Sequence, residues 1–352
     1  MRSLLSILLI GVPVTLILCL IGLSHGLLED SQARARGIGA DVIVRGSTAS
    51  SVVSTSSASI NEGLVRKLEE QPNVKLAMGV IVHPIEQPLN IMGIDLDKFN
   101  QMSGGFTYLA GGPLQGDFDV LIDRYYAAQK HVGVGDSLKM MNHDWRVAGI
   151  IEGGKLARIV VKKRVLQDLD AATGKVSVIY VKCDDPSQAN AVAAELKSLL
   201  SGQYPVITME EFMSMFNVNN IQGLREFLWV IVGIGVLIGF AVVCLSMYMS
   251  VLQRTREIGI LKSLGASKTF ILRIILTEAV MLGIGGTILG IFMSYGAYYL
   301  IRTFVPASIP MVIVKIWWPI AGAITLVGAT LGALYPGLSA ARHDPIEALA
   351  YE

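Results

Sequence analysis

The sequence predicts a membrane protein with four transmembrane α-helices and a large α/β (α+β) extracytoplasmic domain. Three observations lead to this fold class: four long stretches without charged residues, one normally charged segment of about 200 residues, and two strand–helix–strand patterns within that segment. Only 16% of the 352 residues are charged and 52% are hydrophobic, whereas a soluble domain has about 25% charged residues. This composition excludes an ordinary soluble protein and a disordered chain, and a net charge of +1 gives no support to nucleic-acid binding.

Each uncharged stretch reaches the roughly 20 residues that a helix needs to cross the hydrocarbon core of a bilayer. The stretches are Ser3 to Ser24, Phe227 to Gln253, Ala279 to Ile301 and Ile316 to Ala341. We therefore predict spans at residues 1–28, 227–253, 269–302 and 316–338, with a short loop at 303–315 and a tail at 339–352. A cleaved signal peptide is the alternative for the first span. The apolar run is longer than the about 7–15 residues of such a peptide, and no A-x-A site precedes Glu29, so a retained helix is favoured.

The orientation follows from the residues between the second and third spans. This link has five basic residues against one acid, Glu257; the basic residues are Arg254, Arg256, Lys262, Lys268 and Arg273. Because basic loops stay on the cytoplasmic side, both termini are expected inside and residues 29–226 outside. The outside segment has 20 basic and 23 acidic residues, as a soluble domain would.

The extracytoplasmic segment contains two strand–helix–strand patterns. The first has strands at 41–46 and 74–82 around a helix at 60–71, and the second has strands at 176–182 and 204–208 around a helix at 187–200. Two such units commonly form a ferredoxin-like sandwich, which we assign to residues 41–95 and 171–208. Residues 96–170 are expected to form an inserted, mainly-β subdomain. Ser59-x-x-Glu62 is a candidate capping box for the first helix, and the Ser-rich residues 47–59 are expected to form a plain loop.

Stalk helices are predicted at residues 29–40 and 209–226, where the domain joins the first and second spans. The first span can continue to Arg36 and end near Gly37. Thr208-x-x-Glu211 resembles a capping box, and no proline follows until Pro306, so a single helix from Met209 to Gln253 is expected. The stalks either transmit movement across the membrane or serve as spacers, and the length of a helix does not decide between these roles.

The cytoplasmic link at 254–268 is expected to contain a short helix. Ile258, Leu261 and Leu264 recur at i, i+3 and i+6 and form one apolar stripe. Gly265 suits the position after the helix, and Ser267 can cap the next one. The stripe can dock into a groove on a soluble partner or lie on lipid headgroups, and the pattern leaves both interpretations open.

Two features within the spans are ambiguous. Glu278 suits either a substrate or proton site or a packing role near the inner face, and the second is favoured because ionisable residues near an interface can snorkel. The small-xxx-small pairs Gly235/Gly239, Gly286/Gly290 and Gly328/Gly332 permit close helix packing, either within the chain or against a second copy. The histidines and cysteines are scattered, and no metal-ligand spacing occurs among them.

Five segments carry a resemblance to one known family: TREIGILKSLGAS, LTEAVMLGIGGTILG, ARHDPIEALAYE, VGVGDSLKMMNHDWRVAGIIE and VSVIYVKCDDPSQANAVAAELKSLL. Together they resemble the FtsX/MacB-type permeases of ABC transporters. The first three are similar to that family's coupling helix, third span and C-terminal tail, and the last two are similar to its periplasmic domain. The resemblance extends along essentially the whole chain. One departure is that family members commonly begin with a basic amphipathic helix, whereas only Met1 and Arg2 precede the apolar run here.

The resemblance implies a homodimeric permease of the bacterial cytoplasmic (inner) membrane, with an extracytoplasmic domain of the MacB periplasmic type. Its coupling residues would dock on a pair of ABC ATPase subunits; they are Glu257, Ile258, Gly259, Leu261, Leu264, Gly265 and Ala266. The sequence has no G-x-x-x-x-G-K-[ST] loop, so ATP and Mg²⁺ would bind the partner ATPase, and no cofactor, metal or catalytic residue is expected in this chain. A periplasmic adaptor or lipoprotein carrier and the lipid bilayer are further expected partners, and no nucleic acid is.

The expected function is transmission of ATP-driven movement to the external domain, which drives export or extraction of a substrate at the outer face. The alternative is the same architecture acting as a regulator of a cell-envelope enzyme without transport. A membrane-anchored sensor would need a cytoplasmic effector domain, and the link and tail are too short to form one. A secondary transporter would show more spans, internal repeats and intramembrane charges.

Overall fold

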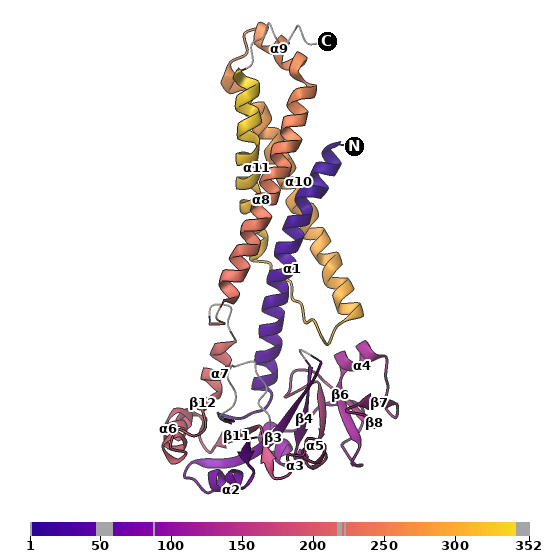
Figure 1. Ribbon diagram of the computed structural model, residues 1–352, viewed down its shortest axis with the longest axis vertical. Helices are drawn as coiled ribbons and strands as arrows, with labels where there is room; N and C mark the ends of the chain where they lie inside the picture. The colour runs from indigo at the N-terminus through magenta and orange to yellow at the C-terminus, as the bar shows by residue number, and fades with distance from the viewer. Residues whose placement is uncertain (1, 47–58, 87–88, 217–219, 222, 343–352) are drawn as a thin grey trace. The chain divides into compact units, whose positions relative to one another are not determined.

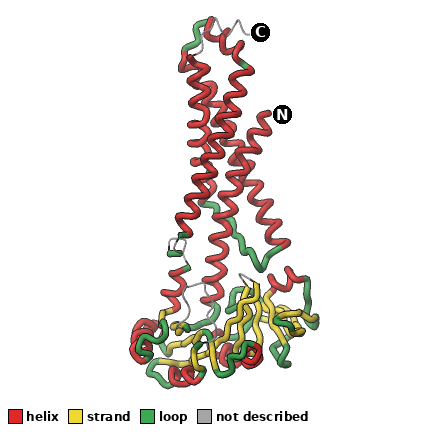
Figure 2. Tube along the Cα trace, in the orientation of Figure 1, coloured by secondary structure: helices red, strands yellow, loops and turns green. Residues whose placement is uncertain are grey.

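The computed structural model describes residues 2–46, 59–86, 89–216, 220–221 and 223–342. They form two compact units, which we call the helical unit and the sheet unit (Figures 1 and 2). The helical unit consists of Met1–His25, Gln222–Ile301 and Met311–Glu352, and the sheet unit of Gly26–Ile221 and Arg302–Pro310. Helix α1 (Arg2–Arg36) contributes residues to both. The expected continuation of the first span to Arg36 is confirmed, with Gly37 directly after it.

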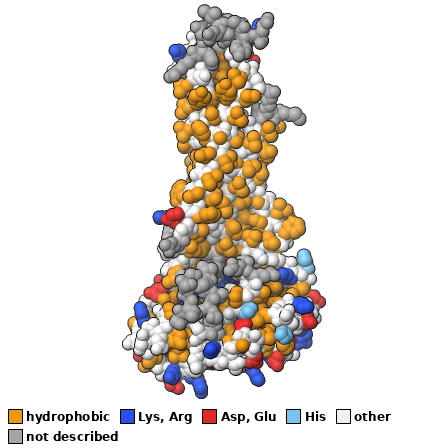
Figure 3. Space-filling view, viewed as in Figure 1, with side chains coloured by type: hydrophobic (Ala, Val, Ile, Leu, Met, Phe, Trp, Pro, Cys, Tyr) orange, Lys and Arg blue, Asp and Glu red, His pale blue; other side chains and the backbone are white. Residues whose placement is uncertain are grey.

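The helical unit is built from long apolar helices. They are α1, α8 (Leu224–Gln253), α10 (Lys268–Phe304) and α11 (Trp317–Arg342), with the short α9 (Thr255–Ser263) between α8 and α10. Among the described residues, these four long helices have the length and composition to cross a membrane. Apolar side chains cover most of their visible surface (Figure 3). The fold class predicted for the spans is therefore confirmed, and α11 continues four residues beyond the predicted end at 338.

Glycines bring the helices of this unit close together within one chain. Gly286 of α10 packs directly against Ile10 of α1, so a side chain there would overlap Ile10. A Cβ at Gly332 of α11 would lie 2.7 Å from the carbonyl oxygen of Phe240 on α8. Gly239 instead has open space where its Cβ would be. Its partner Gly235 does lie against α1, since a Cβ there would be 3.0 Å from the Ile17 side chain. Each of the three small-xxx-small pairs therefore has at least one glycine that permits close helix packing within the chain.

The sheet unit contains a ten-stranded sheet in the order β12-β1-β11-β3-β4-β9-β6-β8-β5, with β7 also paired to β8. The first strands are β1 (Val42–Arg45), β2 (Ile60–Asn61), β3 (Val74–Glu86), β4 (Leu89–Ile94), β5 (Tyr108–Gly111) and β6 (Asp119–Asp123). The others are β7 (Ser137–Met140), β8 (His143–Ile151), β9 (Ile159–Lys162), β10 (Lys175–Val176), β11 (Val178–Cys183) and β12 (Val206–Thr208). The helices are α2 (Gly63–Glu69), α3 (Leu96–Ser103), α4 (Arg124–Lys130), α5 (Lys163–Leu169), a 3₁₀ turn (Pro186–Gln188), α6 (Ala189–Leu199) and α7 (Met209–Met215).

The two predicted strand–helix–strand units meet in one antiparallel sheet. They are β1-α2-β3 and β11-α6-β12, and their strands lie in the order β12-β1-β11-β3. One apolar core lies between this sheet and its helices and includes Leu68 of α2 and Leu196 of α6, which are both 0% exposed. This arrangement is the split β-α-β type that the patterns predicted.

The inserted part shares its sheet with the first part. The second half of β3 forms a hairpin with β4, and β4 pairs in parallel with β9. The predicted boundary at residues 95 and 96 therefore falls within a continuous sheet, because β4 lies before that boundary and pairs with a strand after it. The inserted part also contains the helices α3, α4 and α5 beside its strands.

Two local predictions about the helix starts are wrong. Ser59 does not cap α2: the N-cap is Glu62, without a side-chain hydrogen bond, and the buried Ser59 hydroxyl has no hydrogen-bond partner among the described residues. The amide of Ser59 instead donates to Val176 O, as in a strand. The predicted single helix from Met209 to Gln253 is interrupted, because α7 ends at Met215 and α8 begins after Gly223.

The interruption has a local cause. Two of the described residues between α7 and α8 are Asn220 and Gly223, and asparagine and glycine are poor helix formers. The Asn220 side chain donates to Ser214 O, which competes with continuation of α7. Gly223 has φ +81, outside the helical region. The capping box at the start of α7 is confirmed, since Thr208 Oγ1 accepts from the Glu211 amide and the Glu211 carboxylate accepts from the Thr208 amide. The predicted Ser-rich loop and the last ten residues of the predicted tail lie outside the described residues, except for Ser59.

Candidate functional site

The short helix α9 follows the second span after a single non-helical residue. Arg254 has φ −107 and ψ 16, and α9 begins at Thr255. The Thr255 hydroxyl donates back to the last turn of α8, at 2.8 Å from Leu252 O. The Ile258 amide donates to Arg254 O at 2.9 Å. These hydrogen bonds close the joint, so α9 is attached to the end of α8 without a flexible linker.

The other end of α9 is closed by a glycine turn. Gly265 has φ +93, a conformation that glycine adopts without strain. Its amide donates to Lys262 O, and the Ala266 amide donates to Leu261 O, both at 3.0 Å. Ser267 Oγ then accepts the Phe270 amide at 3.2 Å at the start of α10. Both predictions, a terminating Gly265 and a capping Ser267, are confirmed.

The predicted apolar stripe divides between two environments. Ile258 packs against the core of the helical unit, and Gly259 beside it is buried. Leu261 and Leu264 face outward, with 37% and 80% of their surface exposed. Ile260, which the stripe did not include, is also exposed, at 45%. The outward face therefore follows an i, i+1, i+4 pattern, and Ile260 could have been found by testing that spacing.

Charged side chains lie at the beginning of α9. Glu257 is exposed in its first turn, where the helix dipole favours an acid. Arg254 Nη1 lies 3.5 Å from Glu278 Oε2 of α10, and the Ser250 hydroxyl lies 3.5 Å from the other oxygen of the same carboxylate. Glu278 thus contacts the end of α8, which fits the packing role favoured for it. The pairing with Arg254 was not predicted, because residues 24 positions apart give no periodic signal.

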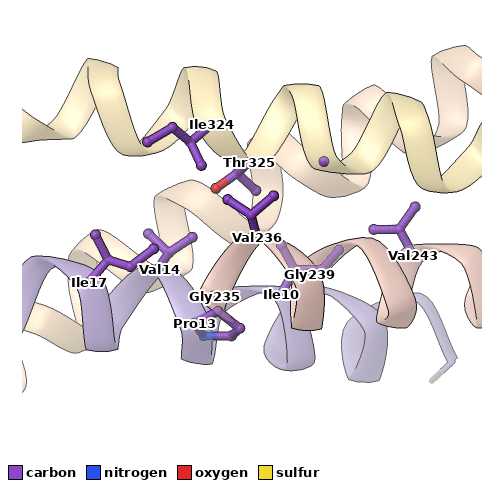
Figure 4. Close-up of a pocket in the computed structure, with 11 residues that line it drawn as sticks. Ile10, Pro13, Val14, Ile17, Gly235, Val236, Gly239, Val243, Ile324 and Thr325 are labelled. Atoms are coloured by element: carbon purple, nitrogen blue, oxygen red, sulfur yellow. The ribbon is translucent and has the colours of Figure 1, made fainter. Parts of the chain in front are cut away.

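An apolar crevice lies between α1, α8 and α11 (Figure 4). Its eleven lining residues include one hydroxyl, that of Thr325, which donates to Ala321 O within its own helix. The remaining lining residues are aliphatic, proline or glycine, among them Ile17 and Val236. The crevice therefore has no polar lining for an ion or a polar solute. Among the described residues, no group of three or more His, Cys, Asp or Glu side chains is placed to hold a metal ion.

The C-terminal end of α1 contacts α7 within the sheet unit. Gln32 Nε2 donates to Phe216 O at 2.7 Å, and Arg36 Nε lies 3.3 Å from the sulfur of Met213. Met213 and Phe216, which precede the second span in the sequence, are thus held against the last turns of α1. Since α7 and α8 are separate helices, the two predicted stalks are not equivalent.

Comparison with known proteins gives two family matches that together extend over most of the chain. The profile described as a MacB-like periplasmic core domain matches residues 3–199, and that of the FtsX-like permease C-terminal domain matches residues 229–346. The first match alone includes more than half of the chain.

Individual relatives carry related names. An uncharacterized ABC transporter permease, YknZ of Bacillus subtilis, is 36% identical over 184 residues, which are 50% of this chain and 45% of that protein. The macrolide export ATP-binding/permease protein MacB of Rhodopirellula baltica is 31% identical over 192 residues, 51% of this chain and 27% of that protein. The chain thus spans less than half the length of either relative in these matches. A solved structure, the periplasmic region of MacB from Actinobacillus actinomycetemcomitans, is 16% identical with a TM-score of 0.38, and the match includes 53% of this chain and 97% of that one.

The four apolar helices, the sheet unit and the two family matches agree with one another. This multi-pass membrane chain therefore belongs to the MacB/FtsX-type family of ABC transporter permeases.

Proposed function

We propose that the chain transmits ATP-driven movement from a separate pair of cytoplasmic ATPase subunits to its sheet unit on the outer side of the membrane. This movement drives export or extraction of a substrate at the outer face. The observation that carries the proposal is the outward apolar face of α9, with Leu264 80% exposed on a helix fixed between two membrane spans. Such a face suits a groove on a soluble partner.

The acid beside this face suits a protein partner, whereas the basic residues of the same helix suit a lipid surface. Glu257 is exposed in the same short helix as Ile260 and Leu261, and Leu264 is the C-cap of that helix. The cytoplasmic leaflet carries anionic lipids, which attract basic residues and repel a carboxylate. A basic or hydrogen-bonding groove on an ATPase subunit would instead accept it. Arg256 and Lys262 still allow lipid contact elsewhere on the helix, so the lipid-bound arrangement is retained as an outcome of the test.

Two properties support an energy source in another chain and a substrate handled outside the membrane. The sequence has no Walker A motif, so ATP and Mg²⁺ would bind the partner. The crevice among α1, α8 and α11 is apolar, whereas membrane pathways for polar solutes are lined by polar groups. The same proposal includes a second copy of the chain and an adaptor or lipoprotein carrier as partners. It also places the chain in the bacterial inner membrane, with both termini inside.

Co-purification with a candidate ABC ATPase subunit, expressed together with this chain, tests the proposal. Glu257→Lys and Leu264→Glu each change the outward face of α9 and should lose stable association and stimulation of ATP hydrolysis. Glu226→Lys is the matched control, because Glu226 is an exposed acid at the opposite end of α8. Stable association and normal stimulation in Glu257→Lys and Leu264→Glu would overturn the assignment of α9.

A further inference from the structure

The short helix α4 of the sheet unit is held by specific contacts at both ends. At its start, Asp123 is the N-cap, and its Oδ1 accepts the Tyr126 amide at 2.7 Å. The other oxygen of Asp123 accepts Arg158 Nη1 at 2.7 Å. Both side chains of this ion pair are buried, at 3% and 4% exposed. Breaking one partner of such a pair leaves an uncompensated buried charge, so the two residues stay together during small movements.

Arg158 connects the start of α4 to α1. Its second terminal nitrogen, Nη2, donates to Asp30 Oδ2 of α1 at 2.9 Å. Asp30 also pairs with Arg34 at 2.7 Å on the same helix. A backbone hydrogen bond joins the same two segments: the amide of Leu156, two residues before Arg158, donates to Arg34 O of α1 at 3.1 Å. Through Arg158, the end of α1 and the N-cap of α4 share one buried guanidinium.

The last turn of α4 binds the loop that follows the third predicted span. Gln129 Oε1 accepts the amides of Ala307 and Ser308, at 2.9 and 3.1 Å. Gln129 Nε2 donates to the Ser308 hydroxyl at 2.8 Å. Ala307 is 1% exposed and packs in the same core cluster as Tyr126 of α4. In Figure 1 this loop lies beside α4. One side chain therefore satisfies two loop amides and a hydroxyl.

We propose that α4 is a relay that joins the loop at Arg302–Pro310 to the external end of α1. The chain of contacts is Ser308 and Ala307 to Gln129, then α4, then Asp123 to Arg158 and Asp30. A seven-residue helix is about 10 Å long and moves as one piece. A displacement of the loop would reach α1 through α4, and a displacement of α1 would reach the loop. The relay rests on the proposed function for the source of the movement that it would transmit. The contacts that form the relay can still be tested on this chain without an ATPase.

Hydrogen exchange of the full chain in lipid nanodiscs tests the relay. Gln129→Leu keeps the size of the side chain and removes all three hydrogen bonds. Gln129→Glu keeps oxygens that can accept both amides and the Ser308 hydroxyl, so it should retain the wild-type pattern. The matched control is Gln203→Leu, because Gln203 is exposed and its side chain forms no hydrogen bond with any residue that the structure describes.

In Gln129→Leu, peptides that contain Ala307 and Ser308 should exchange roughly tenfold faster, because their amides lose their acceptor. Peptides that contain Tyr126 and Leu156 should also exchange about threefold faster, while β11 is unchanged. Faster exchange confined to the loop would overturn the relay, and so would an equal rise in β11, which would indicate loss of overall stability. The same acceleration in Gln129→Glu would contradict the role of the hydrogen bonds. Failure of the proposed function would appear separately, as normal ATPase association in Glu257→Lys.

Discussion

Arg254 and Glu278 connect the end of the second span to the third span, with Nη1 of the guanidinium 3.5 Å from Oε2 of the carboxylate. Arg254 is also the single residue between α8 and α9, so this pair lies at the joint from which α9 projects. The Ser250 hydroxyl approaches the same carboxylate. The direction of α9 is thus set by contacts from both neighbouring spans.

Removing the ion pair between Arg254 and Glu278 should weaken the coupling between α9 and the partner's ATP hydrolysis, while α9 itself remains folded. Glu278→Gln keeps the shape of the side chain and an oxygen for Ser250, but it loses the charge that attracts Arg254. A partly exposed ion pair contributes about 0.2–1 kcal/mol, so stimulation of the partner's ATP hydrolysis should fall up to about fivefold. The measurement is ATPase stimulation by purified permease variants. The double variant Arg254→Glu/Glu278→Arg restores opposite charges and should recover part of the loss; unchanged stimulation in Glu278→Gln would contradict the role of the pair.

Gly265 should not tolerate a side chain, for a conformational rather than a steric reason. Its φ is +93, while a Cβ there would have no neighbour within 4 Å. A β-branched residue in this conformation is strained by about 1–2 kcal/mol, so Gly265→Val should loosen the α9 turn and lower ATPase stimulation. Gly233→Val is the control, because it also has open space and no positive φ. Equal effects of the two substitutions would indicate that helix propensity, not the turn, is responsible.

Gly286 should not tolerate a side chain, for the steric reason that α1 lies directly against it. A Cβ would overlap Ile10, so Gly286→Val should force α1 and α10 apart and destabilise the full chain by about 1–3 kcal/mol. Thermal unfolding in detergent measures this effect. Gly296→Val on the same helix has open space at the Cβ and should unfold close to wild type. A Gly286→Val protein as stable as Gly296→Val would show that the two helices do not pack closely.

The sheet unit should lose stability in acid through Asp119. Hydrogen bonds from Arg146 and from the amides of Gly116 and Gln115 lower the pKa of Asp119 from 3.8 to about 2. Because the folded pKa is depressed, the carboxylate stabilises the fold above about pH 4, and this contribution is lost as the pH falls toward 2. The loss should be about 1–2 kcal/mol, since Arg146 is itself exposed.

Unfolding of wild type and Asp119→Asn between pH 2 and 6 measures this contribution. Wild type should be the more stable protein at pH 6, and the difference should shrink as the pH falls from 4 to 2. A stability difference that is the same at pH 2 and pH 6 would mean that the charge of Asp119 is not responsible for it.

The sequence was sufficient to predict those elements that depend on neighbouring residues or on a periodic pattern of hydrophobic residues. The uncharged stretches predicted the four long helices, and Thr208, Gly265 and Ser267 predicted the helix ends, because capping depends on residues within one turn. The capping prediction failed at Ser59, which has the correct spacing for a capping box but directly precedes strand β2 and donates its amide to Val176 O. The prediction of one continuous helix after Met209 also failed, because the absence of proline was given more weight than Asn220 and Gly223.

The parts that the sequence could not predict depend on long-range contacts. Gln129 and Ser308 are 179 residues apart, and Asp30 and Arg158 are 128 apart. Neither pair belongs to a periodic pattern, so only the fold brings them together. The same holds for β4, whose parallel pairing with β9 joins the two parts of the sheet unit. On α9 the stripe predicted an apolar helix, but packing of Ile258 into the core determined which face stays outward.

Site-specific photo-crosslinking from α9 in native membranes tests the central claim most directly. A photoreactive residue at Ile260 or Leu264 faces outward, and one at Ile258 faces the core of the helical unit. The account predicts that the two outward positions crosslink to a polypeptide containing a G-x-x-x-x-G-K-[ST] loop, while position 258 crosslinks only within this chain. Crosslinks from positions 260 and 264 to lipid alone would contradict it and would identify α9 as a helix that lies on the membrane surface.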